Sequence, residues 1–144
     1  MSEEATVYGA VILWRADSQR VEAYARNRDV VCALPQSATY PDELLTRGMF
    51  TAPLEALGRL GLYRNQVIHF GASYNHLCDF WHLWLEQFEH LLRRLLWMQA
   101  HLHLSVEPFG DHSYHWEAVG GWEQMAADQG VKQWTFRGGP RTFV

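Results

Sequence analysis

The sequence predicts an α+β domain in which an antiparallel sheet packs against one long amphipathic helix and several shorter helices. Short apolar runs separated by turn-forming residues are typical of strands. Segment 74–97 repeats apolar residues at three- and four-residue steps, which predicts a helix. Segment 99–119 contains two alternating stretches around a turn, which predicts a hairpin. A chain of 144 residues is long enough for one domain, so we expect residues 1–144 to form one.

The N-terminal part of the chain predicts an antiparallel meander. Residues 6–15, "TVYGAVILWR", form an apolar run in which Val, Ile and aromatic residues favour a strand. Residues 20–25 alternate small or apolar side chains with polar ones, and residues 29–35 form a second apolar run that ends at Pro35. We expect three strands here, joined by turns.

The middle of the chain predicts two short helices, a strand and the long helix. Segments 41–48 and 51–61 each begin with residues that favour helix starts and end at Gly. Segment 65–70 is a candidate strand. The helix at 74–97 has an apolar stripe that should face the core. Its members are Leu77, Trp81, Trp84, Phe88, Leu91 and Leu95.

The C-terminal part predicts a hairpin followed by shorter elements. After the 99–119 hairpin we expect a helix at 121–130, ended by Gly130, and a last strand at 131–136. Residues 137–144 are rich in Gly and Pro and are expected to form a loose tail.

The two strands of the hairpin separate their side chains by chemistry, because alternate residues of a strand point to opposite faces. The apolar set explains why the hairpin folds, and the long helix should cover its members Leu102, Leu104 and Trp116. The full set comprises Leu102, Leu104, Tyr114 and Trp116. The polar set comprises His101, His103, His115 and Glu117. Matching the faces across the hairpin predicts His103 opposite His115 and His101 opposite Glu117.

This polar set has three interpretations. Three imidazoles and a carboxylate are a ligand set for zinc or another divalent transition metal, which would be the only cofactor we expect. The same groups can supply a general acid and base near neutral pH. The pattern favours most the third interpretation, a polar face turned to solvent or to a partner.

His101, His103 and Glu107 also resemble part of the first cupin motif, in which two His and a Glu on strands bind a metal. The resemblance covers only these three residues. Leu95 and Tyr114 stand where the motif has glycines. Because cupins are all-β barrels, the helix predicted at 74–97 also departs from the family.

Composition narrows the class of protein. The net charge is −4 and basic residues are scattered, so we expect no nucleic-acid partner. The sequence contains no run of 18 uncharged apolar residues, so we expect no helix that spans a membrane. Two cysteines do not make a disulfide framework, so a reduced, cytoplasmic setting is expected. The aromatic share of 14%, with seven Trp, indicates a large core or a binding surface.

From these observations we expect a non-catalytic protein-binding or inhibitory protein, for example a bacterial immunity protein or antitoxin. Its partner would be another protein, and a homodimer is a further expectation. One alternative is a metal-binding protein or hydrolytic enzyme that uses the histidine-rich face. Another is a small-ligand binding domain with a Trp-lined cavity between sheet and helix.

Overall fold

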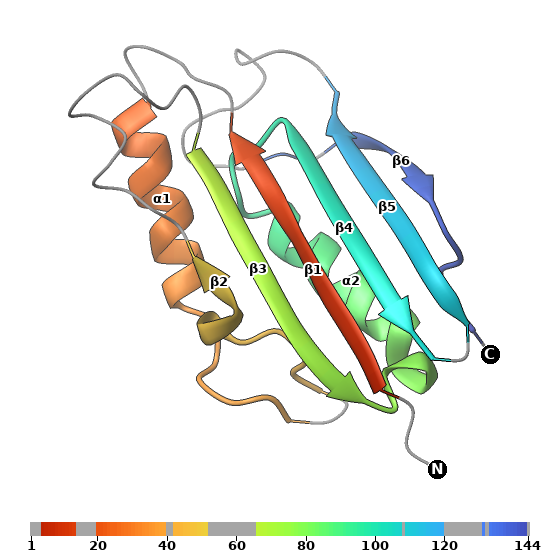
Figure 1. Ribbon diagram of the computed structural model, residues 1–144. Helices are drawn as coiled ribbons and strands as arrows, with labels where there is room; N and C mark the ends of the chain where they lie inside the picture. Colours follow the sequence, from red (N-terminus) through yellow and green to blue (C-terminus); the bar gives the residue numbers. More distant parts are fainter. Residues whose placement is uncertain are drawn as a thin grey trace.

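The predicted α+β fold is confirmed by a computed structural model, which describes residues 4–13, 20–39, 42–51, 66–107, 109–119, 131 and 133–143. Within these residues six strands form one antiparallel sheet in the order β2-β3-β1-β4-β5-β6 (Figure 1). The strands are β1 (Glu4–Leu13), β2 (Phe50–Thr51), β3 (Gln66–Asn75), β4 (Gln99–Val106), β5 (Gly110–Ala118) and β6 (Trp134–Gly138).

The first four strands have the connectivity of two interlocked split βαβ units. Strands β1 and β2 are parallel with β3 between them, and β3 and β4 are parallel with β1 between them. Helix α1 (Arg20–Cys32) follows β1, and helix α2 (Trp81–Leu92) follows β3. This is the β-α-β-β-α-β pattern, to which the hairpin partner β5 and then β6 are added at the β4 side.

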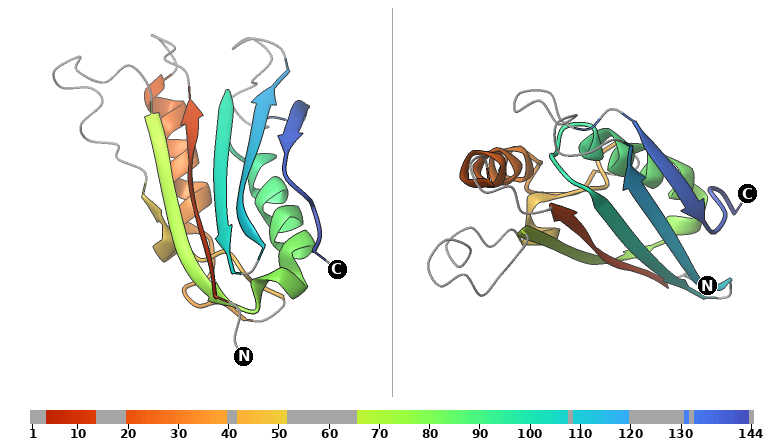
Figure 2. Two further views of the ribbon diagram at one scale, coloured as in Figure 1. Left: turned by 45° about the vertical axis from the view of Figure 1, so that its right-hand side comes forward. Right: turned by 90° about the horizontal axis from the view of Figure 1, so that it is seen from above.

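Both helices lie on the same face of the sheet (Figure 2). The opposite face, which is nearest the viewer in Figure 1, carries no helix in the described part of the chain. We call this opposite face the open face. An antiparallel sheet can keep one face packed and the other solvated, so its strands alternate apolar and polar residues.

The core lies between the sheet and α2. The predicted apolar stripe of the helix is confirmed, since all six of its members are buried. Phe88 packs its ring 5.1 Å from Phe70 of β3 and 5.1 Å from Trp116 of β5, measured between centroids. The predicted apolar face of the hairpin is also buried against this layer. Trp81, Trp84, Trp97 and Trp116 are fully buried, so much of the aromatic excess serves the core.

The predicted strands at 20–25 and 29–35 are wrong, because residues 20–32 form α1. The reason lies in Asn27, which is fully buried although it is polar. Its amide accepts a hydrogen bond from the Leu96 N–H at 2.8 Å and donates one to the Leu96 carbonyl at 2.9 Å. A buried Asn breaks the apolar pattern of a helix, and the polar residues around it therefore resembled a turn.

The long helix is shorter than the predicted 74–97. Strand β3 continues to Asn75, His76 has a left-handed backbone with φ of 61°, and a 3-10 turn at Leu77–Phe80 leads into α2. After Leu92 the chain leaves the helix, and the Trp97 indole N–H donates to the Leu92 carbonyl at 2.7 Å. Residues 95–98 are buried although they follow the end of α2. The apolar pattern therefore continues beyond the helix.

Two further predictions need correction. Segment 41–48 is not a helix over its described residues, since a 3-10 turn covers only Arg47–Met49 and Glu43 pairs with Thr39 in an isolated bridge. Residues 137–143 are not a loose tail. Gly138 ends β6, and the Pro140 carbonyl accepts hydrogen bonds from Tyr114 Oη at 2.6 Å and Trp81 Nε1 at 3.1 Å.

The other predicted elements are found or are not described. The strand predicted at 65–70 is the first half of β3, and the strand predicted at 131–136 is β6, shifted toward the C-terminus. The hairpin at 99–119 is confirmed as β4 and β5. The helices predicted at 51–61 and 121–130 lie outside the described residues, apart from Thr51 in β2.

Candidate functional site

The open face is organised in rows that run across the strands. Side chains that are register partners point to the same face, so one row can be followed from strand to strand. The central row runs from Thr51 on β2 through His69, Ala10, His101, His115 and Arg137, on β3, β1, β4, β5 and β6. Four nitrogen-rich side chains therefore share one line across the sheet, with the small Ala10 between two of them.

A hollow of about 850 Å³ lies over this row. Neighbouring strands are about 4.8 Å apart, so His69 and His101 stand roughly 10 Å apart on either side of Ala10. The Ala10 methyl group is short, and this leaves open space between the two imidazoles. The residues that line the hollow include Tyr8, His69, His101, His103, His115 and Arg137.

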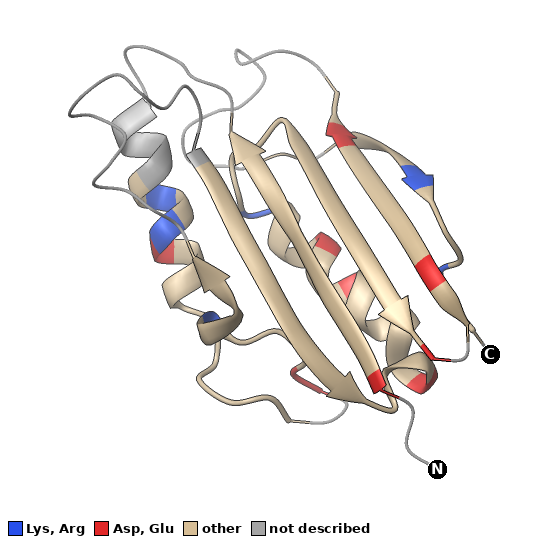
Figure 3. Cartoon of the chain, in the orientation of Figure 1, with Lys and Arg blue, Asp and Glu red and all other residues tan. Residues whose placement is uncertain are grey.

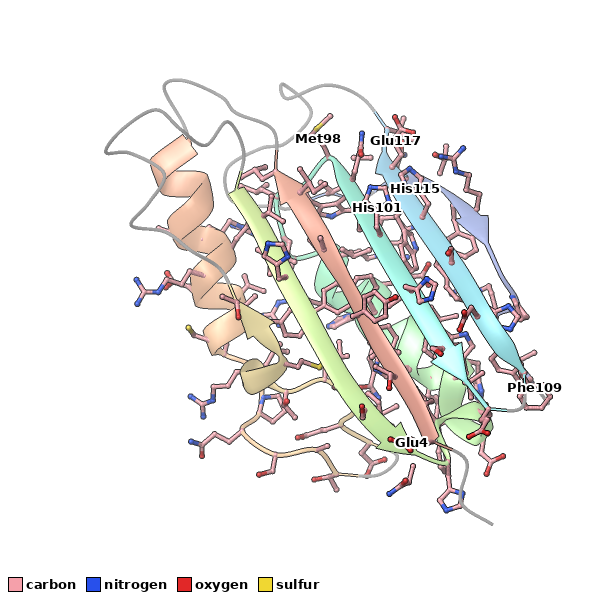
Figure 4. All side chains as sticks on the ribbon, viewed as in Figure 1. Glu4, Met98, His101, Phe109, His115 and Glu117 are labelled. Carbon is pink, nitrogen blue, oxygen red and sulfur yellow. The ribbon has the colours of Figure 1, made fainter. Side chains whose placement is uncertain are left out.

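His101 and His115 face each other directly (Figure 4). Their Nδ1 atoms are 3.0 Å apart and their ring centroids 4.5 Å apart. The outer nitrogen of each ring faces an oxygen, because His101 Nε2 is 3.3 Å from Gln99 Oε1 and His115 Nε2 is 3.9 Å from Glu117 Oε2. Gln99 and Glu117 are themselves register partners, one row further along the hairpin.

The predicted register of the hairpin is therefore wrong by two residues, although the predicted faces are correct. His115 pairs with His101, Glu117 pairs with Gln99, and His103 pairs with Ser113. A shift of two residues keeps every side chain on its face, so face matching cannot detect it. The length of the turn fixes the register. Val106 pairs with Gly110, so the loop between β4 and β5 is shorter than the loop that the predicted register requires.

His103 stands apart from the imidazole pair. Its ring is 4.9 Å from the Tyr8 ring, between centroids, and its Nδ1 is 3.5 Å from Ser113 Oγ. Of the four predicted residues, the structure thus brings His101, His115 and Glu117 together and places His103 in the next row. Among the described residues no group of three or more His, Cys, Asp or Glu is arranged to hold a metal ion.

Burial lowers the pKa of His115, and the neighbouring His101 and Arg137 lower it further, while Glu117 acts in the opposite direction. A lowered pKa means that this imidazole is neutral at pH 7. Its ring nitrogens are then available as a hydrogen-bond donor and an acceptor.

Charge is distributed unevenly over the open face. The hollow has no Asp or Glu among its lining residues, and Arg137 lies at its β6 side. Acidic residues lie toward the strand ends instead, as with Glu4 and Glu117 in Figure 4 and the red positions in Figure 3. The hollow thus offers donors and one fixed positive charge, although the chain as a whole carries −4.

Sequence reasoning missed His69, Tyr8 and Arg137 as members of this site. Each comes from a strand that is distant from the hairpin in sequence, and only the strand order brings them beside it. Their alternation within each strand was a usable signal. Alternation can assign a face to each of these residues, but it cannot show that β1 and β6 flank the hairpin or that β3 lies beyond β1.

In the described part of the chain, aromatic side chains fill the layer between the sheet and α2, where we expected a Trp-lined cavity. Trp81 and Trp84 stack with centroids 5.2 Å apart, and Phe88 packs on Trp116, so their rings fill this layer. The hollow is on the other face, and its lining contains no Trp.

Among the described residues no helix has the length and apolar character to cross a membrane. No family model, no curated protein and no solved structure matches the chain.

Proposed function

We propose that the protein is a non-catalytic binding protein that holds an acidic segment of a partner protein against its open face. One observation carries this proposal. The hollow of about 850 Å³ is lined by four imidazoles, Tyr8 and Arg137, and by no carboxylate. Donors and a fixed positive charge in a concave surface favour a partner that brings negative charge.

The composition of the hollow supports a protein partner. Tyr and Arg are the residues that most often dominate binding energy in protein interfaces. Tyr8 is 49% exposed, although it lies near the middle of the sheet, and Arg137 is exposed at the β6 side. A partner that covers the row from His69 to Arg137 would bury both residues.

An inhibitor of the immunity or antitoxin type is the concrete form that we propose, because such proteins act by covering a surface of their target. We place the protein in the cytoplasm, where reduced cysteines persist. Both of its cysteines, Cys32 and Cys78, are free. A second copy of the chain is a further candidate partner. A measurement of molecular mass in solution would identify such a homodimer.

Charge reversal in the hollow tests the proposal. Arg137→Glu places a carboxylate where the partner's acidic segment would lie, and we expect at least about a tenfold loss of affinity, since like charges in an interface cost several kcal/mol. Arg28→Glu on α1 is the matched control, because Arg28 is also exposed but lies on the helix side of the sheet. The measurement is co-purification with tagged chain from the native cells, followed by titration of the recovered partner.

The two variants separate the possible outcomes. Loss of the partner with Arg137→Glu and its retention with Arg28→Glu would support the proposal. Retention of the partner by Arg137→Glu, or recovery of no partner by the unmodified chain, would overturn it.

A further inference from the structure

We propose that the outer edge of β6 pairs with β6 of a second copy of the chain, so that two sheets join into one antiparallel sheet. The inference goes beyond the proposed partner, because it concerns the edge of the sheet and not the hollow. In the described part of the chain, β6 is the last strand at its side of the sheet (Figure 1). An edge strand presents unpaired N–H and C=O groups, to which another strand can be added.

The hydrogen bonds between β6 and β5 show which backbone groups of β6 face outward. The Gly139 N–H donates to the Ser113 carbonyl at 3.0 Å. At the other end, the Val119 N–H donates to the Gln133 carbonyl at 3.0 Å. Because hydrogen-bonded pairs alternate along an antiparallel ladder, the odd-numbered residues of β6 bond to β5. The N–H and C=O groups that point away from β5 are therefore those of Trp134, Phe136 and Gly138.

A two-fold axis at Phe136 gives each of these outward groups a partner. Phe136 then pairs with Phe136 of the second copy, and Trp134 of each chain pairs with Gly138 of the other. A shift of the second strand by two residues in one direction leaves Gly138 without a partner in β6. The same shift in the other direction places Arg137 opposite Arg137, and like charges directly opposite each other destabilise a pair. The pairing centred on Phe136 is therefore favoured.

The side chains along the edge fit the same pairing. Trp134 and Phe136 are large but only partly buried, so their remaining exposed surface is available to a second strand. In the proposed pair, Trp134 lies across from Gly138 of the second copy, and an aromatic side chain packs well across from an edge glycine. On the open face Arg137 lies across from Thr135 of the second copy, so this pair brings no like charges directly opposite each other.

The pairing also changes the surroundings of the hollow. Register partners point to the same face of a sheet, so the two open faces would lie on the same side of the joined sheet. Thr135 and Glu117 are register partners within one chain. The central row of one chain would therefore continue from Arg137 into Thr135 and then Glu117 of the second copy. Each hollow would border on the second chain at its β6 side, as expected for a symmetric dimer.

Cysteine cross-linking tests the proposed pairing. In the pair, the Cα atoms of Thr135 and of Arg137 from the other chain would be about 4.5 Å apart, which a disulfide can bridge. Two copies of the same position would be roughly 8 Å apart, which is too far for a disulfide. Thr135 and Arg137 are both exposed, so either can be replaced by Cys without a loss of core packing. Cys32 is exposed as well, and Cys32→Ser removes it from all samples.

The two variants, Thr135→Cys and Arg137→Cys, are produced separately and by co-expression, and then mildly oxidised. Non-reducing electrophoresis should show at least about tenfold more linked dimer after co-expression than with either variant alone, since only the mixed pair has the required geometry. The separate variants are the matched controls, because each carries the same reactive group. Equal linkage in all three samples, or linkage of one variant alone, would overturn the proposed pairing, as would no linkage after co-expression.

Sedimentation of the unmodified chain over a dilution series provides a second measurement that needs no substitution. We expect a species with twice the mass of one chain that dissociates on dilution. The mass of a single chain at every concentration would overturn the inference. Both measurements use the purified chain alone, so their outcome is independent of the partner proposed for the hollow.

Discussion

Tyr114 is buried in β5, and its hydroxyl group connects α2 to the C-terminal segment. The hydroxyl accepts a hydrogen bond from Trp81 Nε1 at 3.0 Å and donates one to the Pro140 carbonyl at 2.6 Å. Burial raises the pKa of Tyr114 to about 12, against an ordinary value of 10.0, and the hydrogen bond from Trp81 and the charge of Arg141 oppose this rise. The folded state therefore holds this proton more tightly than the unfolded state does.

Alkaline pH should remove the stability that this proton provides. Because the folded pKa is raised, the contribution is fully present below about pH 10 and is lost as pH rises toward about 12. Tyr114→Phe carries no such group. We expect the advantage of the unmodified chain over Tyr114→Phe, about 1 kcal/mol at neutral pH for one hydrogen bond, to shrink over this range. Urea unfolding at pH 8, 10 and 11 measures it, and a difference independent of pH would contradict the assignment.

Gly9 allows β1 to pack closely against β4 at His101, which is one member of the imidazole pair. A Cβ atom at Gly9 would lie 2.0 Å from the His101 carbonyl oxygen and 2.7 Å from the Phe70 ring. Gly9→Ala should therefore lower the free energy of unfolding by about 1–3 kcal/mol or more. Gly71→Ala is the matched control, because its nearest atom would be 3.5 Å away, an ordinary contact. Equal stability of the two variants in urea unfolding would show that β1 and β4 are not this close.

The C-terminal segment after β6 is held by α2, contrary to the expectation of a loose tail. Arg141 forms an ion pair with Glu89 of α2, and Glu89 Oε2 also accepts a hydrogen bond from Trp116 Nε1 at 2.9 Å. The Arg141 guanidinium lies 5.0 Å from the Phe136 ring centroid. One charged side chain thus joins a strand, a helix and the segment itself.

Arg141→Ala should release this segment with little loss of overall stability. Because the Arg141 side chain is 42% exposed, its ion pair is worth about 1 kcal/mol or less. We expect faster hydrogen exchange at the Gly139 N–H, which donates to the Ser113 carbonyl at 3.0 Å. Arg94→Ala, at an exposed position after α2, should leave that exchange rate unchanged. Unchanged exchange in Arg141→Ala would show that the other contacts of the segment, such as those of Pro140 and Phe143, hold it without Arg141.

Helix α2 and the hairpin could be predicted from sequence because their patterns are local. Apolar residues recur every three or four positions in α2, and every second position in β4 and β5. Helix α1 could not be predicted in this way, since the buried Asn27 is satisfied by Leu96, which lies 69 residues away. The pairing of His101 with His115 depended on the length of one turn, which alternation does not encode.

The arrangement of the whole sheet turns scattered residues into one surface. His69, Tyr8 and Arg137 carry no shared motif, and only the order β3-β1-β4-β5-β6 places them around the hairpin histidines. The helices cover the other face, where Trp81, Trp84, Trp97 and Trp116 are buried. In the described part of the chain, the open face carries the hollow that the histidines, Tyr8 and Arg137 line. We propose that a partner contacts this open face and not the helix face.

Position-specific photo-cross-linking can show which face of the sheet contacts the partner. A benzophenone amino acid at Tyr8 places the reactive group in the hollow, and the same group at His82 places it at an exposed position on α2. In native cells, we predict a discrete cross-linked partner from Tyr8 that is lost when Arg137→Glu is added, and none from His82. Cross-linking of a partner from His82 but not from Tyr8 would contradict the account.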